Sequence, residues 1–147
     1  MSCSFAQVRV VLDTSVLVAG LRSRHGASFR VLDLVAHRKL VPLASVALFL
    51  EYEAVLKRPE QRQATGLTAR DVEGVLAALA SAAAPVDVNF RWRPQLRDPA
   101  DELVLEAAVN GQAQAIVTHN VRHFASAAEA FGIRTMTPGD LLKELQR

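Results

Sequence analysis

The chain has almost no cysteine, no long hydrophobic run and little net charge. Its single cysteine, Cys3, cannot form a disulfide within the chain, which fits a reducing compartment. No apolar run approaches the ~18 residues that a membrane-spanning helix needs, so we expect no membrane association. The first residues lack the charged and long apolar regions of a secretory signal, so we expect a cytoplasmic protein.

The net charge of +2 is too small to mark a basic nucleic-acid binder by bulk charge. Positive charge is instead local: Arg22 and Arg24 follow the first strand-like run, and Arg97 precedes an acidic segment. Phosphate contacts need local charge, and arginine forks match phosphate oxygens. These three arginines are therefore candidate contacts to a nucleic-acid backbone, although a genomic base bias would also enrich arginine.

What the chain does contain is a regular alternation of strand-like and helical segments. Half of its residues are apolar and 22% are charged, as in folded proteins, and 147 residues predict one domain, 1–147. Strands are predicted at 8–12, 40–43, 86–88, 113–118 and 133–136. Helices are predicted at 15–20, 27–37, 46–57, 69–84, 99–110, 126–131 and from 138 onward. This alternation predicts an α/β fold with a parallel sheet covered on both faces.

Three residues set expected boundaries in this pattern. Pro42 indicates that the strand at 40–43 lies at the edge of the sheet or at a strand end, because proline lacks the N–H that a ladder needs. Gly20 and Pro59 are expected to end the helices before them.

Acidic and amide side chains recur where strands are predicted to end or helices to begin. They are Asp13, Glu51, Asp98, Asp101, Glu102 and Asn120. Parallel α/β sheets bind ligands at the carboxyl ends of their strands. Ligand sets made only of oxygen select hard cations such as Mg²⁺ or Mn²⁺, which activate water and assist phosphoryl displacement. The residues alone therefore indicate a metal-dependent phosphodiester hydrolase.

Helix physics offers ordinary explanations for the same carboxylates. Asp13 is a good N-cap, although Thr14 and Ser15 supply the same chemistry. Glu51 is typical of a solvated helix surface. Asp98 followed by proline and further carboxylates is also what a helix N-terminus favours.

Two other chemistries leave weaker signals. His119 and His123 are four residues apart, a spacing that can hold a transition metal on a helix, but no third ligand is near in the sequence. A phosphatase of the haloacid-dehalogenase type, with Asp13 as nucleophile, usually has a second aspartate two residues later. This chain has Ser15 at that position.

Five segments, in order, resemble those of PIN-domain nucleases. They are VVLDTSVLV (10–18), LEYEAVLKRP (50–59), RDPADELVLEAA (97–108), IVTHNVRHF (116–124) and GIRTMTPGDLL (132–142). Each segment is weak alone, but their order and spacing are specific, and together they cover nearly the whole chain.

The resemblance implies a three-layer α/β/α fold with a five-stranded parallel sheet and a ribonuclease site that needs Mg²⁺ or Mn²⁺. It assigns Asp13, Glu51 and Asp101 as metal ligands and catalytic residues, with Asp98 assisting and Asn120 in the fourth acidic position. The residues expected to assist them are Thr14, Ser15, Glu102 and Thr118. Many relatives are VapC-like toxins of bacterial toxin–antitoxin pairs, which form homodimers and are inhibited by an antitoxin in the active-site groove.

One position departs from the family pattern. Relatives often have aspartate after Thr-Gly, where this chain has Thr118, His119 and Asn120. Asparagine keeps an oxygen ligand but loses a negative charge, which weakens binding of a second metal ion. The expected activity is hydrolysis of RNA that leaves a 5′-phosphate. The alternative is a catalytically weak or inactive PIN-fold module that binds RNA or a partner.

Overall fold

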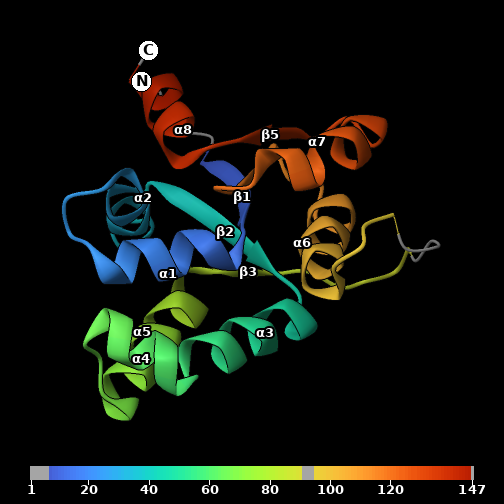
Figure 1. Cartoon of the computed structure of the whole chain (residues 1–147). Coiled ribbons are helices and arrows are strands. Elements are labelled where there is room, and N and C mark those ends of the chain that lie inside the picture. The colour runs from blue at the N-terminus through green and yellow to red at the C-terminus, as the bar shows by residue number, and fades with distance from the viewer. Residues whose placement is uncertain (1–6, 91–94, 147) are drawn as a thin grey trace.

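Eight helices and five strands alternate along residues 7–90 and 95–146, the parts of the chain that the computed structural model describes (Figure 1). Cys3 lies outside these residues. The strands are β1 (Val8–Leu12), β2 (Leu40–Ala44), β3 (Ala84–Pro85), β4 (Ala115–Val117) and β5 (Arg134–Met136). The helices are α1 (Thr14–Arg22), α2 (Ala27–Ala36), α3 (Val46–Leu56), α4 (Pro59–Thr65), α5 (Ala69–Ala82), α6 (Pro99–Asn110), α7 (Val121–Ala130) and α8 (Pro138–Leu145).

The strands form one parallel sheet in the order β3-β2-β1-β4-β5, which confirms the expected α/β class. The chain runs outward from β1 to β2 and β3, then returns to place β4 on the other side of β1. Ligands of open α/β sheets bind at the carboxyl ends of the strands where the order reverses in this way. Asp13 directly follows β1 and Thr118 directly follows β4, so both residues lie at this reversal.

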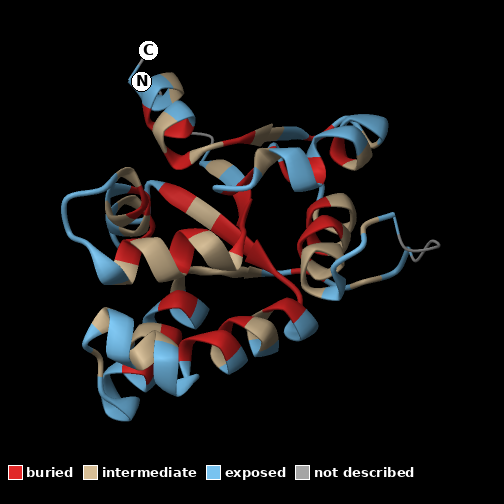
Figure 2. Cartoon of the chain, viewed as in Figure 1, coloured by how far each residue is buried: buried red, intermediate tan, exposed pale blue. Residues whose placement is uncertain are grey.

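The carboxyl-terminal parts of the two strands beside the reversal are deeply buried. Val10, Val11 and Leu12 of β1 are fully buried, as are Ile116 and Val117 of β4 (Figure 2). Their continuous apolar sequence is typical of strands covered on both faces. Helices α1 and α2 pack together on one side of the sheet, and α6 and α7 pack together on the other (Figure 1). The carboxyl ends of β1 and β4 thus project from a rigid core.

The sequence correctly predicted the N-terminal caps of three helices. The Asp98 side chain accepts the Ala100 backbone N–H at 2.9 Å at the start of α6. The Ser45 side chain accepts a hydrogen bond from the Leu48 backbone N–H at 3.1 Å at the start of α3. Thr68 and Asp71 form a reciprocal capping box at the start of α5. Each of these caps depends only on residues within one helical turn, so the sequence alone predicts it.

Pro42 does not mark an edge strand, because β2 pairs with β1 on one side and β3 on the other. β3 pairs only with Leu43 and Ala44, so the proline lies just outside that two-residue ladder. This short contact explains how an interior strand tolerates a residue without an N–H.

Of the two expected helix stops, the one at Gly20 was wrong and the one before Pro59 was correct. α1 continues through Gly20 to Arg22, and a Cβ at Gly20 would lie 2.5 Å from Cδ1 of Leu32, so the glycine lets α1 and α2 pack closely. α3 ends at Leu56, ahead of Pro59 as expected, and Pro59 also opens α4, a helix that the sequence pattern did not predict. Proline suits that first position because its missing N–H has no partner within the helix.

Two further boundaries differ from the prediction. The strand expected at 86–88 is β3, two residues earlier, and the helix before it ends at Ala82. α7 begins at Val121 rather than at 126, because Phe124 and Ala128 form a fully buried face that extends the helix. No helix within the described ranges has the length and apolar character to cross a membrane.

Candidate functional site

Asp13 lies at the base of the candidate site, where β1 ends and α1 begins, and only 6% of it is exposed. Its Oδ2 accepts hydrogen bonds from Ser15 Oγ at 2.9 Å and from Thr118 Oγ1 at 2.7 Å. Two hydroxyl donors compensate a carboxylate that would otherwise be costly to bury. The Asp13 side chain makes no capping bond to α1, and no described residue hydrogen-bonds to its Oδ1. Helix capping therefore does not account for this carboxylate.

Thr118 connects the end of β4 to Asp13 across the reversal in the sheet. It is fully buried, and its Oγ1 also accepts the Asn120 backbone N–H at 2.9 Å. Ser15 Oγ accepts the His119 backbone N–H at 3.3 Å. Ser15 and Thr118 therefore orient Asp13 and hold the segment after β4 against α1.

A cavity of about 560 Å³ opens over Asp13. Its walls come from α1, from α3 and the start of α4, from the start of α6 and from the segment after β4. It gathers most of the residues that the sequence singled out: Asp13, Thr14, Ser15, Arg22, Glu51, Asp98, Asp101 and Asn120. Residues far apart in the chain thus meet where the order of the strands predicts a ligand.

Three of the expected residues do not line this cavity, besides the buried Thr118 beneath it. The Glu102 carboxylate accepts the backbone N–H groups of Gln95 and Leu96, so it holds the segment that enters α6. Arg24 is exposed in the loop after α1. Arg97 lines a neighbouring cavity.

Glu51 faces the cavity because its neighbour Tyr52 is anchored in the core. The Tyr52 hydroxyl donates to the carbonyl oxygen of Leu12, and the side chain is fully buried. Burial, together with the charge of Asp13, raises the pKa of Tyr52, so the phenol remains a donor. Glu53 points elsewhere and pairs with Lys57 at 3.0 Å, which confirms that the two glutamates of α3 lie on different faces.

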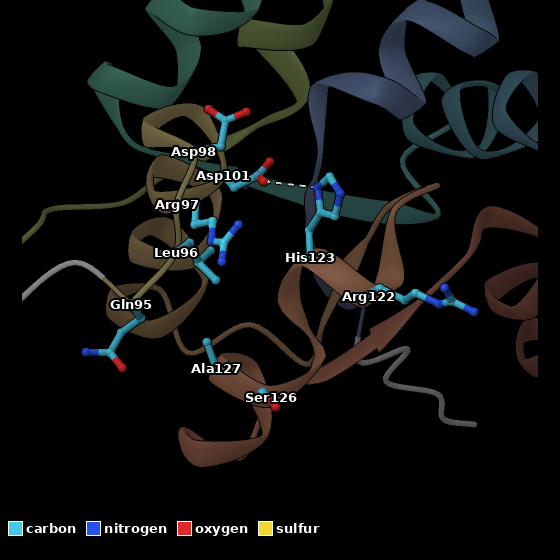
Figure 3. Close-up of a pocket in the computed structure, with 9 residues that line it drawn as sticks. All are labelled: Gln95, Leu96, Arg97, Asp98, Asp101, Arg122, His123, Ser126 and Ala127. Atoms are coloured by element: carbon cyan, nitrogen blue, oxygen red, sulfur yellow. Dashed lines mark hydrogen bonds and ion pairs between the residues drawn. The ribbon is translucent and has the colours of Figure 1, made fainter.

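Negative charge is concentrated around Asp101, whose side chain is 14% exposed. Burial raises the pKa of Asp101, and the charges of Asp13 and Asp98 raise it further. His123 opposes this shift, with its Nδ1 3.2 Å from Oδ2 of Asp101 (Figure 3). Crowded carboxylates of this kind are relieved by a bound cation.

The four carboxylates of the cavity fit a hard divalent cation, and the amides of Gln61 and Asn120 add neutral oxygen atoms. No three His, Cys, Asp or Glu side chains within residues 7–90 and 95–146 form a ready metal-binding group. The expected joint coordination by Asp13, Glu51 and Asp101 is therefore not preformed. Mg²⁺ typically binds through one or two carboxylates and keeps several waters. Asp13 and Asp101, whose charges interact directly, meet that requirement.

His119 and His123 do not form the histidine metal pair that their spacing allows. His119 precedes α7, and its Nε2 lies 2.7 Å from Oγ of the buried Ser28. His123 is on α7 and contacts Asp101. Because α7 begins only at Val121, the two imidazoles are held by different partners.

Arg58 is a residue of the cavity that the sequence analysis missed. It lines the cavity with Arg22, and neither guanidinium has an ion-pair or hydrogen-bond partner among the described residues. Glu51 and Val55 lie one turn apart on the same face of α3, and Arg58 follows in extended backbone at the N-cap of α4. Its place in the cavity depends on the turn between α3 and α4, which helical spacing does not predict, and it puts a second free guanidinium beside the carboxylates.

The fold and this cavity define an α/β protein with carboxylates and free arginines at the reversal of its sheet. A family model described as the PIN domain matches residues 9–122, from β1 to the start of α7, and the chain belongs to that family. PIN domains are generally metal-dependent nucleases, so the protein has a nuclease fold. No curated protein matches the chain.

Proposed function

We propose that the protein is an endoribonuclease that requires Mg²⁺ or Mn²⁺ and hydrolyses RNA phosphodiester bonds to leave a 5′-phosphate. The observation that carries this proposal is the pairing of opposite charges in one cavity. Four carboxylates and Asn120 line it together with the unpaired guanidiniums of Arg22 and Arg58. Carboxylates suit a divalent cation, and arginine forks suit the phosphate that such a cation would activate.

The side chains would divide the work according to their positions. A bound Mg²⁺ or Mn²⁺ supplies a Lewis acid and lowers the pKa of water. Asp13 and Asp101 would hold the ion, with Glu51 and Asp98 adding negative charge from the cavity wall. These roles need a fixed Asp13 carboxylate, and the bonds to its Oδ2 supply that rigidity.

The remaining polar groups would bind the substrate. Arg22 and Arg58 would hold the phosphate backbone beside the carboxylates. Asn120 would orient a water molecule or the phosphate through its amide. Its backbone position is set by the bond from its N–H to Thr118.

A matched pair of charge removals tests the activity. Asp13→Asn is expected to lower the rate of RNA cleavage by about a hundredfold or more, the usual effect of removing one charge-stabilising group from an active site. Asp87→Asn makes the same chemical change at an exposed position outside the cavity and should leave the rate unchanged. The measurement is cleavage of a labelled RNA with Mg²⁺, with Mn²⁺ and with EDTA, and of DNA of the same sequence.

Several results of this assay would contradict the proposal. Equal cleavage by wild type and Asp13→Asn would show a contaminating nuclease, and cleavage in EDTA would remove the role of the metal. Cleavage of the DNA as fast as the RNA would change the substrate class.

A second candidate function is a PIN-fold module that binds RNA or a partner with little catalysis. Asn120 favours it, because this residue puts an uncharged amide in the acidic cavity where relatives often have aspartate. Calorimetric titration with Mn²⁺ separates the two functions. Saturable binding below millimolar Mn²⁺ supports the nuclease, and the absence of binding supports the module.

We also propose that the protein is the toxin of a bacterial toxin–antitoxin pair and acts as a homodimer. The resemblance of its five segments to PIN-domain nucleases, many of which are VapC-like toxins, supports this role. If a small reading frame lies beside the gene, its product should co-purify with the protein and inhibit RNA cleavage. A neighbouring product that neither binds nor inhibits would count against the toxin role, and a monomer by light scattering would count against the dimer.

A further inference from the structure

A second cavity, of about 540 Å³, lies next to the acidic one and shares Asp98, Asp101 and His123 with it. One wall is the segment that enters α6, which contributes Leu96 and Arg97. The opposite wall is α7. The volume is within the ~300–1,000 Å³ range of small-ligand pockets. A ligand that occupies the acidic cavity therefore has room to continue into this one.

The side chains of this cavity differ in direction (Figure 3). Leu96 and Arg97 extend from the entry of α6 toward α7, and the His123 ring is held beside them by Asp101. The Gln95 amide and the Arg122 guanidinium point away from the shared space. The hollow is thus formed by Leu96 and Arg97 on one side and by His123, Ser126 and Ala127 of α7 on the other.

The chemistry of the hollow is mixed in a way that suits a nucleobase. Leu96 and Ala127 are half-buried apolar contacts, while Arg97 and Ser126 are exposed polar ones. The Arg97 guanidinium has no ion-pair or hydrogen-bond partner within the described ranges. Guanidinium and imidazole planes stack on unpaired RNA bases, and hydroxyl groups bond to base edges.

We propose that this second cavity binds the nucleotide next to the scissile phosphate and sets the base preference of cleavage. The inference rests on the proposed ribonuclease activity, because it assumes that an RNA phosphate lies in the acidic cavity. The neighbouring nucleotide then enters the hollow, with its base over Leu96 and Ala127 and in reach of Arg97, His123 and Ser126. Asp98 and Asp101 line both cavities, so they fix the position of one site relative to the other.

Filling the hollow with a large side chain tests the proposal. Ala127→Phe puts a ring into the cavity, whereas Ala125→Phe puts the same ring on an exposed face of α7 outside it. Both variants are made in the Asp13→Asn background, and melting temperatures verify folding. The measurement is fluorescence anisotropy of short labelled RNAs that differ at one base, in Mn²⁺.

The Asp13→Asn protein is expected to prefer one base by about tenfold, the scale of a side chain that hydrogen-bonds to a base edge. Ala127→Phe should reduce that preference to less than about twofold, and Ala125→Phe should retain it. Arg97→Gln provides a second variant at an exposed position, with Arg70→Gln as its control at an exposed position outside both cavities. Only the Arg97 change should weaken binding of the preferred RNA.

The outcomes separate this inference from the proposed function. Base discrimination that survives both Ala127→Phe and Arg97→Gln overturns the inference, even if the wild-type protein cleaves RNA. Discrimination that is lost only in these two variants supports the inference, even if no RNA is cleaved, because the anisotropy measurement requires no hydrolysis.

Discussion

Thr118→Val is the substitution that most directly tests how the site is built. The change preserves side-chain shape and removes one hydroxyl from a fully buried position. It breaks the 2.7 Å bond to Asp13 Oδ2 and removes the acceptor for the Asn120 N–H. Ser15 then remains as the only described donor to that carboxylate oxygen.

The expected cost follows from these two bonds. A hydrogen bond to a charged group contributes about 1.5–3 kcal/mol, and the bond from the exposed Asn120 adds little because water can replace its acceptor. We therefore expect a loss of about 2–3 kcal/mol in the free energy of unfolding. For a chain of this size that corresponds to a fall of roughly 4–12 °C in melting temperature.

The sheet provides a matched control for the same substitution. Thr135 lies on β5, and its buried Oγ1 has no hydrogen-bond partner among the described residues. Thr135→Val removes a hydroxyl that bonds to nothing, so it should leave stability unchanged or raise it by roughly 1 kcal/mol. Urea denaturation and thermal melts of both variants in EDTA measure the difference.

Similar stabilities for the two variants would refute this account of the site. They would mean that Thr118 does not hold Asp13, and that the carboxylate is oriented by something else. If the account is right, Thr118→Val should also weaken Mn²⁺ binding by about 10–100-fold, as loss of a residue that supports a metal ligand does.

Two further predictions concern buried groups of the site. Asp101→Asn should stabilise the metal-free protein at neutral pH, because burial and the charges of Asp13 and Asp98 raise the pKa of Asp101. A raised pKa means that the native state binds more protons than the unfolded state, so wild-type stability should fall relative to the variant as pH rises from about 4 through the raised pKa. Urea denaturation in EDTA across pH measures this, and a difference that does not vary with pH would contradict it. Tyr52→Phe should cost about 1–3 kcal/mol, because it leaves the carbonyl of Leu12 without its hydroxyl donor; an unchanged thermal melt would show that the bond contributes nothing.

Local signals made much of the fold predictable. The strand β1, the caps at Ser45 and Thr68 and the start of α6 at Pro99 depend on residues within a few positions of each other. Errors arose where packing overrode the local preference. Gly20 fits a helix end, but the contact of α1 with Leu32 explains it within the helix.

The candidate site was likewise predictable from sequence only in part. The position of Asp13 at the end of a buried strand was evident from sequence, as was the separation of Glu51 from Glu53, because strand ends and helical faces follow from spacing. That Glu102 would bond to backbone amides rather than enter the cavity was not evident. Glu102 directly follows Asp101 in the sequence. Only the path of the segment before α6 shows which of the two carboxylates enters the cavity.

The sequence by itself determined the alternation of strands and helices, the family and the acidic residues at the strand ends, because these depend on short-range patterns. Only the tertiary structure decided which groups meet. Thr118 reaches Asp13 across 105 positions, and the carboxylates are joined by Arg58 from the N-cap of α4 and by His123 from α7. These long-range contacts depend on the order of the strands and the packing of the helices. Both are set only when the chain folds, and they then determine where each side chain points.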